Sequence, residues 1–188
     1  MLTLGIDEVG RGCLAGPLVV GAVILADTPL AGLKDSKQLS RLQREKLVPL
    51  IKQNAFYIGL GWVEATEIDQ VGLSASLVLA ADRATKKLKL NYQRAVIDGG
   101  FNYAPDIFGA EPIIKADTSV AAVSAASVLA KVARDELMIK MAEIYPGYGF
   151  ETNVGYGTAA HLEAINIFGP CPLHRLSFAP LKYLGLTL

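Results

Sequence analysis

Short apolar runs along the chain predict the strands of one sheet. Residues 2–6 and 19–25 are apolar and partly β-branched, and a glycine-rich segment joins them. The runs at 55–63, 94–97 and 112–114 have a similar character. We therefore expect five strands, three of them consecutive along the chain.

One helical pattern precedes the third strand, and the others lie between or after the later strands. Ser40 and Gln43 form a capping box that opens a helix through residue 46 and toward Gln53, with Pro49 as an expected kink. Apolar periodicity predicts further helices over 73–88, 119–145 and 158–168. Strands alternating with helices indicate an α/β fold with a mixed five-stranded central sheet flanked by helices.

The composition changes after Tyr145, where glycines and prolines become frequent. We expect residues 1–145 to form the main domain and residues 146–188 to form a short helical C-terminal extension packed on it. His174 and Arg175 are candidates for anchoring this extension.

Composition and charge narrow the classes of protein. The chain has 188 residues, of which 52% are hydrophobic, and its 18 basic side chains balance 18 acidic ones. These values exclude a disordered chain and a protein that coats nucleic acid through bulk charge. The most apolar stretch, 12–26, contains Pro17 and is shorter than the ~20 residues of a membrane span. We therefore expect no membrane contact. The two cysteines form no C-x-x-C pair, which favours a reducing, cytoplasmic setting, and the absence of an obvious apolar patch favours a monomer.

Four carboxylates stand at the ends of apolar runs. Asp7 and Glu8 follow the first strand, Asp98 follows the fourth and Asp117 follows the fifth. Ligands gather at the carboxyl ends of strands in open α/β sheets, so we expect these acids to converge. Each also has a plainer interpretation, with Asp117 as a helix N-cap and Asp98 as a turn residue before two glycines.

Converging carboxylates indicate a divalent metal. Oxygen ligands without a nearby histidine or thiolate favour Mg²⁺ or Mn²⁺ over zinc. Two such ions in one reacting complex can activate water and stabilise the leaving oxygen in phosphodiester hydrolysis.

The glycine loop after the first strand admits two interpretations. Gly10, Gly12 and Ala15 satisfy a loose G-x-G-x-x-A dinucleotide fingerprint, but a strand rather than a helix is expected to follow, and Asp7 and Glu8 would repel phosphates. Two glycines flanking Arg11 are better suited to bringing backbone amides and one guanidinium against a sugar-phosphate edge.

Two further groups of charged residues have open interpretations. Lys37 belongs to a local basic cluster that either tracks a nucleic-acid backbone or forms a solvated helix face; the other members are Lys34, Arg41, Arg44 and Lys46. Asp135, next to Arg134 on a predicted helix, is expected to form a structural ion pair.

Several motifs together resemble the ribonuclease HII family, the type 2 ribonucleases H. The first is GIDEVGRG at residues 5–12, and the others are LAGP (14–17), DSK (35–37), IDG (97–99), KAD (115–117), SAAS (124–127), AKV (130–132), RD (134–135) and GYGT (155–158). The resemblance covers nearly the whole chain. It implies the ribonuclease H-like fold.

The resemblance also implies an activity and roles for residues. Members cut the RNA strand of RNA–DNA hybrids and nick duplex DNA 5′ to an embedded ribonucleotide, leaving 3′-hydroxyl and 5′-phosphate ends. The matching metal-binding and catalytic acids are Asp7, Glu8, Asp98 and Asp117. The matching nucleic-acid contacts are Gly10, Arg11 and Gly12, which would sense the ribose 2′-hydroxyl, Tyr156, which would stack on the adjoining deoxyribose, and Lys37 and Lys115.

Two positions depart from the family pattern. Cys13 stands where proline is common, and Val154 stands where lysine is common. Two alternative functions stay open at this point. One is another nuclease of the same fold, of the resolvase or transposase kind, and the other is a hybrid-binding protein without turnover.

Overall fold

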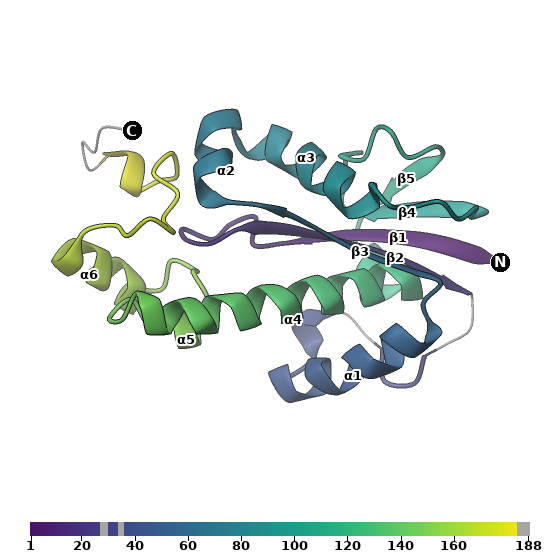
Figure 1. The fold of residues 1–188 in the computed structure, drawn as a ribbon, viewed down its shortest axis with the longest axis horizontal. Coiled ribbons are helices and arrows are strands. Elements are labelled where there is room, and N and C mark those ends of the chain that lie inside the picture. Colours follow the sequence, from purple (N-terminus) through teal and green to yellow (C-terminus); the bar gives the residue numbers. More distant parts are fainter. Residues whose placement is uncertain (27–29, 34–35, 184–188) are drawn as a thin grey trace.

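A five-stranded mixed sheet forms the centre of the protein. A computed structural model describes residues 1–26, 30–33 and 36–183, apart from the side chain of Lys37. The strands are β1 (Leu2–Val9), β2 (Leu18–Ala26), β3 (Tyr57–Val63), β4 (Arg94–Asp98) and β5 (Ala110–Ile113). They lie in the order β3-β2-β1-β4-β5, with β1 antiparallel to β2 and parallel to β4 (Figure 1). The α/β fold class is therefore confirmed.

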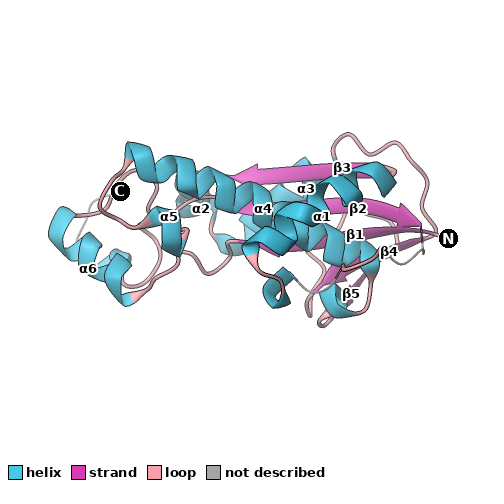
Figure 2. Cartoon of the chain, turned by 90° about the horizontal axis from the view of Figure 1, so that it is seen from below, coloured by secondary structure: helices cyan, strands magenta, loops and turns pink. Residues whose placement is uncertain are grey.

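Helices cover both faces of the sheet. One face carries α2 (Ala65–Val71) and α3 (Leu73–Thr85), and the other carries the long α4 (Ala121–Ile144), with α1 (Arg41–Asn54) outside it (Figures 1 and 2). The capping box of Ser40 and Gln43 is present, and Pro49 lies inside α1. The prediction missed α2, and α3 ends before residue 88. No helix among the described residues is long and apolar enough to cross a membrane.

Glycines let helices approach the sheet closely on both faces. A Cβ at Gly5 in β1 would lie 2.2 Å from the backbone of Ala122, and one at Gly21 in β2 would lie 2.5 Å from the Ala126 carbonyl oxygen. On the opposite face, a Cβ at Gly61 would lie 1.8 Å from the carbonyl oxygen of Ala80 in α3. Real side chains do not tolerate such distances, so glycine determines how deeply α3 and α4 pack.

The chain after α4 folds back onto the loop between β1 and β2. It contains the short helices α5 (Phe150–Asn153), α6 (Ala159–Phe168) and η3 (Leu181–Tyr183). Its apolar side chains, Phe150 among them, pack with Leu14 of this loop and Met138 of α4. The guanidinium of Arg175 is fully buried and donates to the carbonyl oxygens of Gly16 and Arg11. Arg175 is thus an anchor, while the domain boundary at residue 145 stays a prediction.

A buried histidine pair joins α6 to the segment that follows it. The Nε2 atoms of His161 and His174 lie 3.1 Å apart, His161 Nδ1 lies 2.8 Å from the Tyr156 carbonyl oxygen, and the Cys171 N–H donates to His174 Nδ1. These bonds are all satisfied when both rings are neutral, with His174 donating to His161. Burial lowers the pKa of His161, and it lowers the pKa of His174 to about 4.

The histidine pair predicts a loss of stability in mild acid. The pKa of His174 is about 4 in the folded protein and 6.5 in the unfolded chain. The unfolded chain therefore takes up a proton first, and stability that is complete above pH 6.5 falls as the pH drops toward 4. We expect His174 to account for up to about 3 kcal/mol of this loss.

Urea unfolding of the wild type and of His174→Gln at several pH values measures this effect. The difference in free energy of unfolding between the two proteins should shrink as the pH falls through this interval. Parallel curves for the two proteins would show that His174 contributes nothing to the acid sensitivity.

Candidate active site

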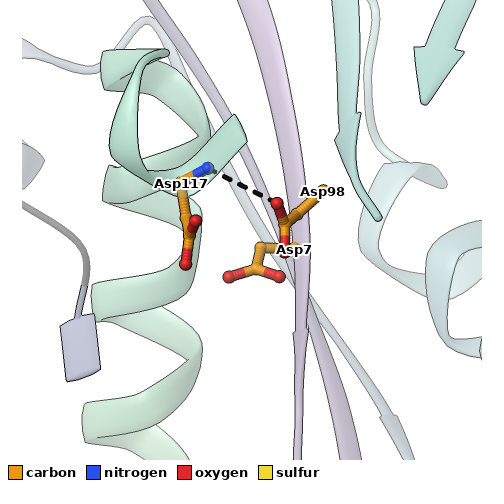
Figure 3. A group of neighbouring side chains, drawn as sticks. All are labelled: Asp7, Asp98 and Asp117. Atoms are coloured by element: carbon orange, nitrogen blue, oxygen red, sulfur yellow. Dashed lines mark hydrogen bonds between the residues drawn. The ribbon is translucent and has the colours of Figure 1, made fainter. Parts of the chain in front are cut away.

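Three of the four predicted acids meet at one place. Asp7 lies in β1, Asp98 ends β4, and Asp117 lies in the 3₁₀ helix η2 (Ala116–Thr118) that precedes α4. Each offers a carboxylate oxygen, and these atoms all lie within 4.8 Å of one another (Figure 3). Figure 3 shows the side chains pointing toward a shared space between the strands and α4. The predicted convergence of these three is therefore observed.

The pairing of the strands explains the position of two acids. β1 and β4 run parallel with Ile6 opposite Ile97, so the next residues, Asp7 and Asp98, lie side by side. Side chains alternate between the faces of a strand, and both apolar partners belong to the core on the α3 face. Asp7 and Asp98 therefore point to the α4 face.

Close packing of α4 brings in the third acid. The first turns of α4 consist of alanine, serine and valine and rest directly over Gly5. The backbone N–H of Asp117 donates to an Asp98 carboxylate oxygen at 3.5 Å, and the Ser124 hydroxyl donates to the Asp117 carbonyl oxygen. Asp117 is 3% exposed, so it is a buried site residue rather than a surface helix cap.

The electrostatics of this cluster favour a bound cation. Asp7 is only 4% exposed, and burial raises its pKa well above the usual value, with further increases from the charges of Glu8 and Asp98. A hydrogen bond from the Ser127 hydroxyl opposes this increase. Three carboxylates forced together in a poorly hydrated place repel one another unless a positive ion lies between them. The oxygen donors fit Mg²⁺ or Mn²⁺.

Glu8 projects to the other face of the sheet. Its Oε2 accepts a hydrogen bond from the Tyr103 hydroxyl at 3.0 Å, and its Oε1 lies 3.5 Å from Nη1 of Arg11. Burial raises the pKa of Glu8, and the nearby Asp98 charge raises it further. The sequence reasoning missed Tyr103, because nothing in its local pattern indicates a contact with a residue so distant in sequence.

The glycine loop lies directly after the acids of β1. Gly10 has φ +84°, and a Cβ there would lie 2.3 Å from Nε of Arg134. A Cβ at Gly12 would meet no heavy atom within 4 Å, so this side of the loop is open. The Arg11 side chain is 50% exposed, while its backbone carbonyl oxygen accepts a hydrogen bond from the Arg175 guanidinium. The loop thus has a hydrogen-bonded backbone and one half-exposed cationic side chain.

The expected structural ion pair of Asp135 is confirmed, but its partner is not the adjacent Arg134. Adjacent residues on a helix point in different directions. The Arg134 guanidinium is buried and donates to the carbonyl oxygens of residues 15, 17 and 154, which places the glycine loop beside the chain that precedes Tyr156. Asp135 instead pairs with Lys131 at 2.8 Å and with Arg44 at 3.7 Å.

The remaining predicted nucleic-acid contacts are Tyr156, Lys115 and Lys37. Tyr156 is 39% exposed, and the Lys131 ammonium lies 5.3 Å from the centre of its ring. Burial raises the pKa of Tyr156 to about 12, so its hydroxyl stays protonated. Lys115 is exposed with φ 60° at the start of η2. The backbone of Lys37 lies in η1 (Ser36–Gln38), and its side chain lies outside the described part.

The basic cluster is only partly free to face a ligand. Arg44 donates to the carbonyl oxygens of Ser36 and Leu39, and Arg41 pairs with Glu45 at 2.7 Å. Lys34 lies outside the described residues. Arg44 therefore supports the η1 segment rather than a solvated face.

Comparison with known proteins decides the family. The family profile described as Ribonuclease HII matches residues 4–181. The chain belongs to the ribonuclease HII family. It is 46% identical over 179 residues to the ribonuclease HII of Nitrosococcus oceani, which covers 95% of this chain and 89% of the relative.

Solved structures of ribonuclease HII proteins have the same fold. The ribonuclease H2 of Pyrococcus horikoshii superposes with a TM-score of 0.79 at 27% identity, covering 97% of this chain and 96% of that one. The ribonuclease HII in a PCNA complex from Archaeoglobus fulgidus gives 0.81 at 25% identity, covering 95% of both chains. The ribonuclease H-like fold implied by the sequence motifs is thus confirmed.

Membership of the ribonuclease HII family establishes the general activity. The protein is a type 2 ribonuclease H, a metal-dependent hydrolase that acts on RNA–DNA hybrids. The non-catalytic alternative and the resolvase-like alternative are therefore set aside.

Proposed function

We propose that this ribonuclease HII cuts the RNA strand of hybrids and also nicks duplex DNA 5′ to an embedded ribonucleotide, leaving 3′-hydroxyl and 5′-phosphate ends. The observation that carries the proposal is the three-aspartate cluster together with the open glycine loop, which begins at Gly10, three residues after Asp7. A phosphodiester bound at the cluster would place its sugar against Gly12 and Arg11. The 2′-hydroxyl is the group that distinguishes ribose from deoxyribose at such a site.

Asp7, Asp98 and Asp117 would hold divalent ions. Glu8, whose side chain points to the other face of the sheet, is the fourth acid that the family resemblance implies. Two bound Mg²⁺ or Mn²⁺ ions supply charge neutralisation at the phosphate and lower the pKa of an attacking water. The protein's part is to fix the carboxylates: parallel strands hold Asp7 beside Asp98, α4 holds Asp117, and Tyr103 orients Glu8. Rigid placement of this kind is what phosphoryl transfer requires of an enzyme.

Nucleic acid would be bound by residues around this cluster. Gly10, Arg11 and Gly12 would face the ribose, and the exposed ring of Tyr156 would stack on the adjoining deoxyribose. Lys115 and Lys37 would contact phosphates. A neutral chain that acts on duplexes needs such local contacts, and it is proposed to act as a cytoplasmic monomer.

A set of three matched duplexes tests the proposal. They have one sequence and contain no ribonucleotide, one ribonucleotide or a full RNA strand, and they are incubated with the protein in Mg²⁺ or Mn²⁺. We expect cutting of the second and third only, with the single nick on the 5′ side of the ribonucleotide. Cutting of the all-DNA duplex, or of the hybrid alone, would contradict the proposed specificity.

Val154 provides a prediction about phosphate contact. It replaces a lysine that is common in the family, and it has a left-handed backbone with φ 43°. Val154→Lys would add one cation beside Tyr156. We expect tighter hybrid binding and a steeper dependence of log K on log salt, by about 0.9 for one added phosphate contact.

A salt titration of hybrid binding for both proteins checks this expectation. Val154→Gln serves as the control, because it is polar and long but uncharged. An unchanged slope for Val154→Lys would place residue 154 away from the phosphates.

A further inference from the structure

The loop between β4 and β5 places two aromatic rings beside Glu8, at the end of β1, and Arg11, in the loop that follows. The guanidinium carbon of Arg11 lies 5.5 Å from the centre of the Phe101 ring. The hydroxyl of Tyr103 donates to Glu8 at 3.0 Å. Arg11 and Glu8 are also in contact with each other, so the four side chains form one connected group.

The aromatic pair is firmly held. Tyr103 is 1% exposed and belongs to the core beneath α3. Phe101 packs edge-on against Tyr103, with ring centres 5.7 Å apart and an interplanar angle of 61°. The loop backbone is fixed as well, because the N–H of Gly99 donates to the Ile113 carbonyl oxygen at 3.0 Å. The position of the Phe101 ring therefore follows from the core.

Arg11 has little else to fix its side chain. It is 50% exposed, and its contact with Glu8 is long, at 3.5 Å. An exposed arginine side chain samples many rotamers, and binding must overcome this entropy if the side chain is free. An aromatic face beneath a guanidinium attracts it and restricts its rotamers. Phe101, itself 42% exposed, is the ring in this position.

We propose that Phe101 is a positioning residue that holds Arg11 ready to contact the ribose and so increases the selectivity for ribonucleotide-containing duplexes. The inference rests on the proposed function of the glycine loop and adds a residue outside that loop. Phe101 acts through Arg11 and needs no contact of its own with the reacting phosphate.

The test compares binding of two duplexes in Mg²⁺, one with a single ribonucleotide and one of DNA alone. An Asp98→Asn background prevents turnover, and fluorescence anisotropy gives both dissociation constants. We expect Phe101→Ala to reduce the preference for the ribonucleotide duplex about threefold to tenfold, with little change in binding to DNA alone. Phe101→Tyr, which retains the ring, should keep the preference.

Phe108→Ala is the matched control, since Phe108 lies in the same loop with 92% of its surface exposed. It should leave the preference unchanged. If Phe101→Ala keeps the full preference, or if Phe101→Tyr loses it, the role of Phe101 is refuted. If the Asp98→Asn protein itself binds both duplexes equally, the ribose reading proposed for the glycine loop fails instead.

Discussion

Asp98→Asn is expected to lower kcat on a ribonucleotide-containing duplex by about three orders of magnitude. Asp98 belongs to the cluster with Asp7 and Asp117 (Figure 3), and the substitution removes one negative charge while it preserves the size of the side chain. Loss of metal-assisted stabilisation of a phosphoryl transition state costs several kcal/mol, and each 1.4 kcal/mol corresponds to about tenfold in rate.

The same substitution should not destabilise the metal-free protein. The Asp98 charge raises the pKa of Asp7, which shows that the two carboxylates repel each other. Without Mg²⁺ we therefore expect the Tm of Asp98→Asn to equal or exceed that of the wild type. Added Mg²⁺ should raise the Tm of the wild type more than that of the variant, because the ion binds the folded cluster.

Asp106→Asn is the control, because Asp106 is an exposed acid of the loop that follows β4. It should retain the activity and the Tm response to Mg²⁺. An Asp98→Asn enzyme with wild-type kcat would refute the assignment of the cluster as the catalytic metal site.

Gly5→Ala is expected to destabilise the protein by about 3 kcal/mol and to lower kcat about a hundredfold. The new Cβ would lie 2.2 Å from the Ala122 backbone, so α4 must move away from the sheet. Asp117 lies just before α4 and moves with it. A displacement of about 1 Å in a catalytic group is enough for a loss of this size.

Gly61→Ala separates the loss of stability from the loss of activity that movement of α4 would cause. Its Cβ would lie 1.8 Å from the Ala80 carbonyl oxygen, so a comparable loss of stability is expected on the α3 face, away from the aspartates. Activity is compared at a temperature at which circular dichroism shows both variants folded. Equal kcat values for the two variants would mean that the depth of α4 does not control the acids.

Much of the fold was predictable because burial imposes patterns on the chain. The strands alternate or are fully apolar, and α1 carries its capping box, so these elements are visible in the sequence. α2 was missed because Ala65–Val71 is too short to show helical periodicity and its cap is a glutamate. β5 begins with the half-buried Ala110 and the exposed Glu111, which show no apolar run, so the prediction began two residues late.

The candidate site, like the fold, was only partly predictable from the sequence. Asp7, Asp98 and Asp117 were predictable because charges at the ends of apolar strands require a physical reason. The contacts of Phe101 and Tyr103 were not predictable, since they depend on where a loop without periodicity lies in space. The ion pair of Asp135 was predicted without a named partner, and its pairing with Lys131 follows the i, i+4 rule for helices.

The most direct test is a crystal structure of the protein soaked in Mn²⁺, with the ion located by its anomalous scattering. The expected result is Mn²⁺ within about 2.5 Å of carboxylate oxygens of Asp7, Asp98 and Asp117. Bound Mn²⁺ elsewhere on the protein, with none at these three side chains, would contradict it.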